Sequence, residues 1–145
     1  MRLEGLLGLL QGDPAYSELL QRLRRPSDSA EASLAHGPSL GILGAARPYV
    51  VAALQQDWPA PILVISGRPE GARLMADQIA AWSAFPERVL YFPAPDAVFY
   101  DRTQWHRETI RARARALARL VGVAGGADKL PQSVQGLVVC TSVWG

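Results

Sequence analysis

Four short apolar runs that alternate with longer helical segments constrain the fold of this 145-residue chain most strongly. The runs fall at about residues 39–43, 62–65, 89–92 and 136–141, and the run at 62–65 is Ile-Leu-Val-Ile without interruption. A strand that is buried on both faces has this composition. The alternation predicts an α/β fold, in which a parallel sheet carries helices on both faces and right-handed crossovers join the strands.

The segments between these runs predict three helices, at about residues 47–56, from residue 69 onward, and at about 104–121. The second of them carries an apolar side of Leu74, Met75, Ile79 and Trp82. Two short helices are expected before the first run, and Asp13 and Pro14 provide the N-cap and first residue of the second one. We therefore expect residues 1–36 to form a helical segment and loop, and residues 37–145 to form a partial α/β domain in the same structural unit.

Composition restricts the chemistry that the chain can carry. Apolar residues make up 49% and charged residues 19%, and the formal charge of +2 is too small to indicate a nucleic-acid binder by itself. Cys140 is the only cysteine, and the two histidines are isolated, so no intrachain disulfide and no Cys/His metal cluster is expected. No apolar run approaches the roughly 18 residues of a membrane span, which favours a cytoplasmic protein without membrane contact.

A glycine-bearing stretch at residues 39–51 has the order strand, loop, helix that frames a phosphate-binding P-loop, G-x-x-x-x-G-K-[ST]. Gly41 fills the first glycine position and Gly44 lies inside the loop, but Ala46, Arg47 and Pro48 replace the second Gly, the Lys and the Ser/Thr. A Cβ hinders the backbone approach to phosphate, arginine is bulkier than lysine, and proline offers neither a hydroxyl nor an N–H. Two interpretations stay open: a P-loop architecture that has lost its nucleotide, or an ordinary strand–turn–helix, which the spacing alone favours.

Several segments, in order along the chain, resemble the first domain of the bacterial transcription-repair coupling factors. That family carries a decayed P-loop followed by an apolar helix, and residues 41–54 are similar to it. Residues 92–102 resemble the family signature FPAWDTLPYDR, although Pro95 stands in place of the usual Trp. The other matching segments are residues 13–16, 108–113 and 138–143.

This resemblance implies a P-loop NTPase-like, UvrB- or helicase-like domain with a degenerate nucleotide site and no cofactor. The chain would be the part similar to the excision-repair protein UvrB, truncated before the inserted module that contacts UvrA. The parent protein would be an ATP-dependent DNA translocase that binds ATP and Mg²⁺, UvrA, RNA polymerase and duplex DNA through regions outside this segment. UvrB probes damaged DNA with a β-hairpin after its third strand, and residues 93–103 are too few for one here. Neither ATP hydrolysis nor damage reading is therefore expected in this segment.

Other polar residues suggest weaker sites. Asp96, Asp101 and Glu108 lack a partner nucleophile, so turn or helix-cap roles are expected for them. Trp105 and His106 could stack on a base, but core packing and surface exposure, respectively, are the commoner fates. The last predicted helix carries a basic face, which is either a solvated surface or a contact for phosphate or a partner. Its residues are Arg107, Arg111, Arg113, Arg115 and Arg119.

These patterns lead to three functional hypotheses. The first is a non-catalytic scaffold domain of a transcription-repair coupling factor, which helps to present and restrain the neighbouring UvrA-binding module. The second is a nucleotide-binding, helicase-like domain whose unconventional P-loop works through Arg47. The third is a DNA-binding module that uses the arginine-rich helix.

Overall fold

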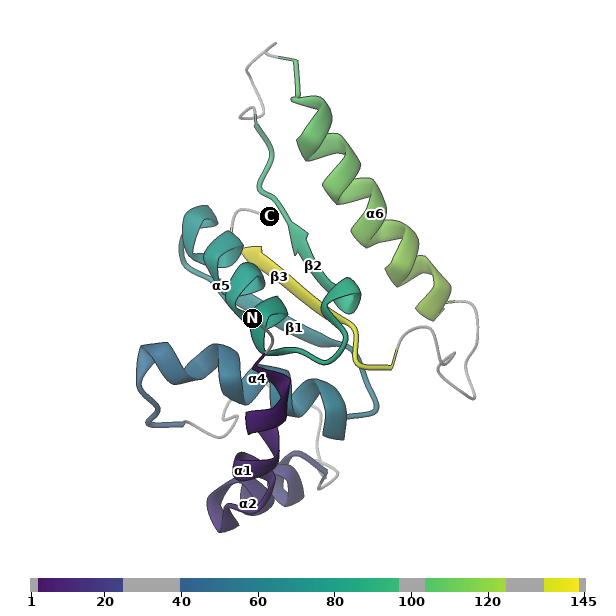
Figure 1. Ribbon diagram of the computed structural model, residues 1–145. Helices are drawn as coiled ribbons and strands as arrows, with labels where there is room; N and C mark the ends of the chain where they lie inside the picture. Colours follow the sequence, from purple (N-terminus) through teal and green to yellow (C-terminus); the bar gives the residue numbers. More distant parts are fainter. Residues whose placement is uncertain (1–2, 25–39, 97–103, 125–134, 144–145) are drawn as a thin grey trace, which may run out of the picture.

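A three-stranded parallel sheet in the order β1-β3-β2 lies at the centre of the fold (Figure 1). The computed structural model describes residues 3–24, 40–96, 104–124 and 135–143. The strands are β1 (Ile62–Ser66), β2 (Val89–Phe92) and β3 (Val138–Ser142). β3 pairs with both of the others, so that Val139 stands opposite Leu63 in β1 and Leu90 in β2. The predicted α/β class and the strands at 62–65, 89–92 and 136–141 are thus confirmed, with small shifts at their ends.

Two long helices connect the strands and lie on opposite faces of the sheet. α5 (Pro69–Trp82) follows β1 and leads to β2, whereas α6 (Arg107–Ala124) follows β2 (Figure 1). α6 begins three residues after the predicted position 104 and continues past the predicted end at 121. Because one crossover covers each face, the predicted arrangement of helices on both faces is confirmed.

The other described α-helices precede the sheet in the sequence. They are α1 (Leu7–Gln11), α2 (Pro14–Arg24) and α4 (Arg47–Asp57). Three short 3₁₀ turns lead into α1, α4 and β2, respectively: η1 (Glu4–Leu6), η2 (Gly44–Ala46) and η3 (Pro86–Arg88). As predicted, Asp13 caps α2: its Oδ1 accepts a hydrogen bond of 2.7 Å from the Ala15 N–H. Tyr16 Oη donates to the Asp57 carboxylate at 2.8 Å and so connects α2 to the end of α4. The part of the predicted helical segment and loop at residues 25–36 lies outside the described residues.

The larger core lies between the sheet and the helices α1, α2, α4 and α5. Its sheet side is formed by Val138 and Cys140, which are fully buried, and by the half-buried Ile62 and Val64. A smaller core lies on the opposite face, where α6 packs on β2 and β3. The smaller core consists of Leu90, Ala116, Leu137 and Val139, with Phe92 and Leu120 at its border.

β1 is covered on one face only, which corrects the prediction that it is buried on both. Leu63 and Ile65 remain 62% and 59% exposed because α6 packs against β2 and leaves the β1 side of its face uncovered. The prediction for Leu74 is also wrong, since this residue of α5 is 58% exposed. Within the described parts of the chain, no helix has the length and apolar character needed to cross a membrane.

A buried polar contact joins α4 to the loops that precede β2 and β3. The Gln55 side chain is 3% exposed; its Nε2 donates to the Gly136 carbonyl at 2.8 Å, and its Oε1 accepts from the Ser83 hydroxyl. Gly136 has φ +66°, in the left-handed region that favours glycine. A Cβ at this position would lie 2.8 Å from the Gln55 carbonyl oxygen, so close packing also requires glycine here.

Gly136→Ala should therefore lower the free energy of unfolding by about 1–3 kcal/mol, through backbone strain at a left-handed position. The matched control is Gly44→Ala, because a Cβ at Gly44 meets nothing within 4 Å and its φ is not positive. The control should be neutral or stabilising by about 0.4–1 kcal/mol. Urea unfolding of both variants measures the difference, and equal stabilities would contradict the assignment of Gly136.

Candidate functional site

The glycine-bearing stretch does not form the predicted strand–loop–helix. Residues 40–43 form no strand; they lead into the 3₁₀ turn η2 (Gly44–Ala46) and then into α4. The side chains of Leu40 and Leu43 are 47% and 81% exposed, and only Ile42 packs against the core. A strand is stable when its backbone groups are paired and at least one face is buried, and most of these side chains stay at the surface. The prediction of a first strand at 39–43 is thus wrong for the four residues that the structure describes.

The backbone of this turn also differs from a phosphate cradle. Neither Gly41 nor Gly44 has a positive φ, and a Cβ added to either would meet nothing within 4 Å. The N–H of Ala46 donates to the Leu43 carbonyl at 2.9 Å, and the N–H of Arg47 donates to the Gly44 carbonyl. A phosphate-binding nest needs successive free N–H groups that point to one side. Here these groups close the turn instead.

Pro48 and Arg47 have different surroundings in the structure. Pro48 is fully buried at the start of α4, so the position that holds the P-loop hydroxyl serves the core here. Arg47 is exposed and lines a groove of about 390 Å³ together with Ser66 and Gly67 at the end of β1. The rest of the lining is apolar: Leu40, Ile42, Val50, Val51, Leu54, Val64, Ile65 and Met75. One arginine in an apolar groove suits an apolar segment better than a polyphosphate, which would need several donors.

The start of α6 is fixed by Asp96, in the helix-cap role predicted for it. Its carboxylate accepts hydrogen bonds from the His106 N–H at 2.7 Å and from the Thr109 hydroxyl at 2.9 Å. Partial desolvation is the largest single influence on the pKa of Asp96 and raises it, but these hydrogen bonds and the neighbouring His106 together bring the pKa below its usual value. Glu108 lies exposed in the first turn of α6, and Asp101 lies outside the described residues.

Arg113 belongs to the structure of the β2–α6 connection and not to a free basic face. Its guanidinium donates to the Pro93 carbonyl at 2.7 Å and lies 4.2 Å from the centre of the Phe92 ring. The ring of Trp105 lies 5.3 Å from the same guanidinium. Trp105 is 39% exposed, so the prediction of core packing for it is wrong, whereas His106 is exposed as predicted.

The other four predicted arginines share one exposed side of α6. None of them forms an ion pair with a residue in the described ranges. They are Arg107, Arg111, Arg115 and Arg119, here called the arginine stripe. The structure therefore groups these side chains as the sequence predicts and leaves them available to solvent or to a partner.

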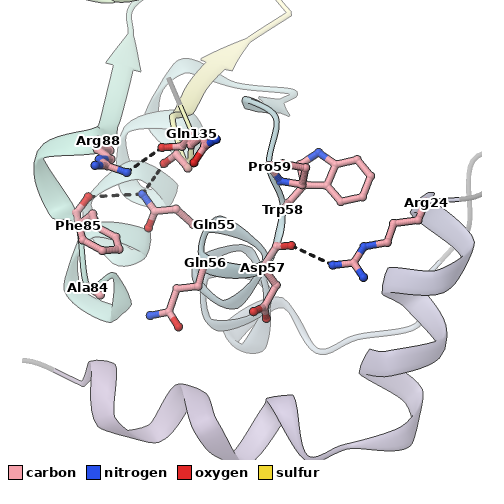
Figure 2. A pocket seen from close by; sticks show the side chains of 11 residues that line it. Arg24, Gln55, Gln56, Asp57, Trp58, Pro59, Ala84, Phe85, Arg88 and Gln135 are labelled. Carbon is pink, nitrogen blue, oxygen red and sulfur yellow. Dashed lines mark hydrogen bonds between the residues drawn. The ribbon is translucent and has the colours of Figure 1, made fainter. Parts of the chain in front are cut away.

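An open cavity of about 750 Å³, which we did not predict from the sequence, lies beside the amino ends of the strands (Figure 2). Arg88 lies on one side of it, where its guanidinium donates to the Gln135 carbonyl at 2.9 Å and lies 4.7 Å from the centre of the Phe85 ring. On the other side, Arg24 donates to the Asp57 carbonyl at 3.3 Å (Figure 2). The sequence signal for these polar contacts is Gln55, a polar residue that directly follows the apolar residues 50–54 of α4. Ligands of parallel sheets usually bind at the carboxyl ends of the strands, whereas this cavity lies at their amino ends. We therefore assign its polar residues a structural role.

The chain brings little reactive chemistry together in the part that the structure describes. No group of three or more His, Cys, Asp or Glu side chains is placed to hold a metal ion among the described residues. Cys140 is buried in the centre of β3, and this burial raises the pKa of its thiol to about 12. A neutral buried thiol is a poor nucleophile, so Cys140 packs as a small apolar residue.

The Cys140 thiol should react with an aromatic disulfide reagent at pH 8 only when the chain unfolds. Its rate should equal the rate of opening measured by hydrogen exchange, and urea should accelerate it in parallel with unfolding. Because the thiol ionises at about pH 8.5 in the unfolded chain but near 12 in the folded one, stability should fall as the pH rises above about 8.5. Rapid labelling of the folded protein would contradict the burial of this side chain.

No protein-family model matches the chain, and no curated protein is significantly similar to it. The resemblance to the transcription-repair coupling factors therefore stays a prediction, based on the short ordered segments given above. The geometry of the described residues is the main basis for the function proposed below.

Proposed function

We propose that this chain is a non-catalytic α/β domain that serves as a scaffold within a larger repair protein. The observation that carries the proposal is the backbone of the turn before α4. Gly41 and Gly44 have no left-handed conformation there, the Ala46 N–H closes the turn, and Pro48 is buried in the core. A turn of this kind positions a helix: the Ala46 and Arg47 N–H groups are used within the turn, and Pro48 offers a triphosphate neither an N–H nor a hydroxyl.

The parent protein in this proposal is a cytoplasmic transcription-repair coupling factor, and this chain belongs to its amino-terminal, UvrB-like region. The ordered segments at residues 13–16, 92–102, 108–113 and 138–143 support that assignment. The parent would use ATP and Mg²⁺ elsewhere to translocate on DNA, displace stalled RNA polymerase and recruit excision repair through UvrA. The present domain would hold the neighbouring UvrA-binding module in place. The scaffold role does not require an ancestral P-loop, and the missing strand at residues 40–43 counts against that origin.

The competing nucleotide-binding function makes a different prediction in a titration. A fluorescent ATP analogue with Mg²⁺ should show no saturable binding to the purified chain up to about millimolar concentration, a range that covers typical nucleotide affinities. Arg47→Ala and the control Gly44→Ala should behave like the unmodified chain. Saturable micromolar binding that Arg47→Ala abolishes would contradict the scaffold role and support the unconventional P-loop.

The proposed parent can be tested in the cell that carries the gene. Loss of the gene should slow the repair of ultraviolet lesions in the transcribed strand of an active gene and leave the other strand unchanged. The ratio of the two repair rates, measured lesion by lesion, should fall to about one. Equal slowing on both strands, or no change on either, would contradict the assignment to transcription-coupled repair while leaving the nucleotide test unaffected.

A further inference from the structure

The face of the sheet that α6 covers is only half closed. Phe92 and Leu90 of β2 and Val139 of β3 pack with α6, and Leu90 and Val139 are 7% and 4% exposed. Leu63 and Ile65 lie on the same face, because they stand in register with Val139 and with Thr141 of β3, but they are 62% and 59% exposed. Parallel sheets are normally covered on both faces. The β1 half of this face therefore lacks a layer in the described structure.

α6 itself presents a second apolar side in addition to the one in the core. Ala116 and Leu120 contact the smaller core, whereas Ile110, Leu117 and Val121 are 50%, 49% and 69% exposed. Positions 110, 114, 117 and 121 recur at the spacing of one helix side, and the residue at 114 is an exposed alanine. Their centre lies about a third of a turn from the buried side. The two apolar sides of α6 together are therefore wider than its contact with the sheet requires.

The direction of this second apolar side follows from the chirality of the connection. β2 leads through α6 to β3 on its own face, and such crossovers are right-handed. α6 is a right-handed helix and runs antiparallel to the strands. Side chains that are rotated by a quarter to a third of a turn from the buried side, in the direction in which the helix winds, therefore point toward β3 and β1. Ile110, Leu117 and Val121 therefore face the same open space as Leu63 and Ile65. We call these five residues the apolar corner.

Charge and shape indicate what covers this corner. One more helix, lying along β1 beside α6, would bury both apolar surfaces in the usual three-layer arrangement. The arginine stripe continues from the outer border of the corner, beginning with Arg107 and Arg111. An occupant helix with acidic residues on that flank would meet complementary charge, as in amphipathic helices that dock into grooves. A second copy of α6 would instead place arginines against arginines.

We propose that the apolar corner is a docking site for one amphipathic α-helix of a partner protein, apolar on one side and acidic along the flank that meets the arginine stripe. The docked helix buries Leu63 and Ile65 below it and Leu117 beside it. The corner lies on the face of the sheet opposite to α4, which carries Arg47, although Ile65 at the edge of β1 lines both the corner and the Arg47 groove. Leu63 and Leu117, the residues used in the tests below, do not line that groove, so those tests do not depend on the absence of nucleotide binding.

Two fluorescent synthetic peptides of 18 residues test the proposal with the complete chain. Both carry leucines on one helical side, and they differ only in glutamates or lysines along the flanks. Fluorescence anisotropy should show at least about tenfold tighter binding of the glutamate peptide, and the difference should shrink in about 1 M salt. Leu63→Lys and Leu117→Lys should each weaken binding by about tenfold or more, as for central interface residues. Both side chains are more than 40% exposed, so neither change should lower the thermal stability.

The control is Leu9→Lys, which changes a side chain that is 74% exposed on α1 and should leave the affinity unchanged. Arg107→Glu with Arg111→Glu should reverse the preference between the peptides. No binding of either peptide at about millimolar concentration, or an unchanged affinity in Leu63→Lys, would overturn the proposal. Equal affinity for both peptides would also overturn the proposal.

Two other results would assign these surfaces to different partners. A dimer in sedimentation that Leu63→Lys dissociates would assign the corner to a second copy of the chain. Tight, salt-sensitive binding of duplex DNA without peptide binding would assign the arginine stripe to nucleic acid.

Discussion

The position of β3 between β1 and β2 is the constraint on which the described structure depends. β3 follows both partners in the sequence, yet it hydrogen-bonds to each of them, and Val138 and Cys140 are fully buried in its centre. The sheet cannot form until residues more than seventy positions apart, such as Ile62 and Val138, are paired. This non-local pairing explains why a buried polar anchor is useful at the entrance to β3. Gln55 fixes the Gly136 carbonyl there, and the left-handed glycine turns the chain into the strand.

The same arrangement decides where the molecule can interact. Two helices, α4 and α5, cover one face of a small sheet, whereas α6 is the only described helix on the other face, and it lies on the β2 side (Figure 1). The exposure of Leu63 and Ile65 thus results from the order of the strands and from the packing of α6 against β2. A scaffold role and an open apolar corner agree with each other, since both assign the chain to contacts with other elements and not to chemistry of its own. The turn before α4 supports this view, because the N–H groups of Ala46 and Arg47 are used to close it.

The sequence was a good guide wherever local pattern and burial coincide. The runs at 62–65 and 89–92, the cap at Asp13 and the amphipathic helices could all be predicted, because hydrophobic period and capping residues act locally. It failed at residues 40–43, where an apolar run of strand-like composition lies mostly at the surface. Composition alone also could not show that β1 is buried on one face, since that depends on which strands α6 covers. Arg113 was predicted as part of a free basic face, but its stacking on Phe92 depends on the path of the β2–α6 connection.

The methyl groups of the three strands report most directly on the half-covered face of the sheet. A soluble paramagnetic agent broadens the NMR signals of methyl groups that solvent can reach. The account predicts strong broadening for Leu63 and Ile65 in β1 and almost none for Leu90 and Val139 on the same face of the sheet. Protection of Leu63 and Ile65 equal to that of Val139 in the isolated chain would contradict the account, because it would show that another part of the chain already covers β1.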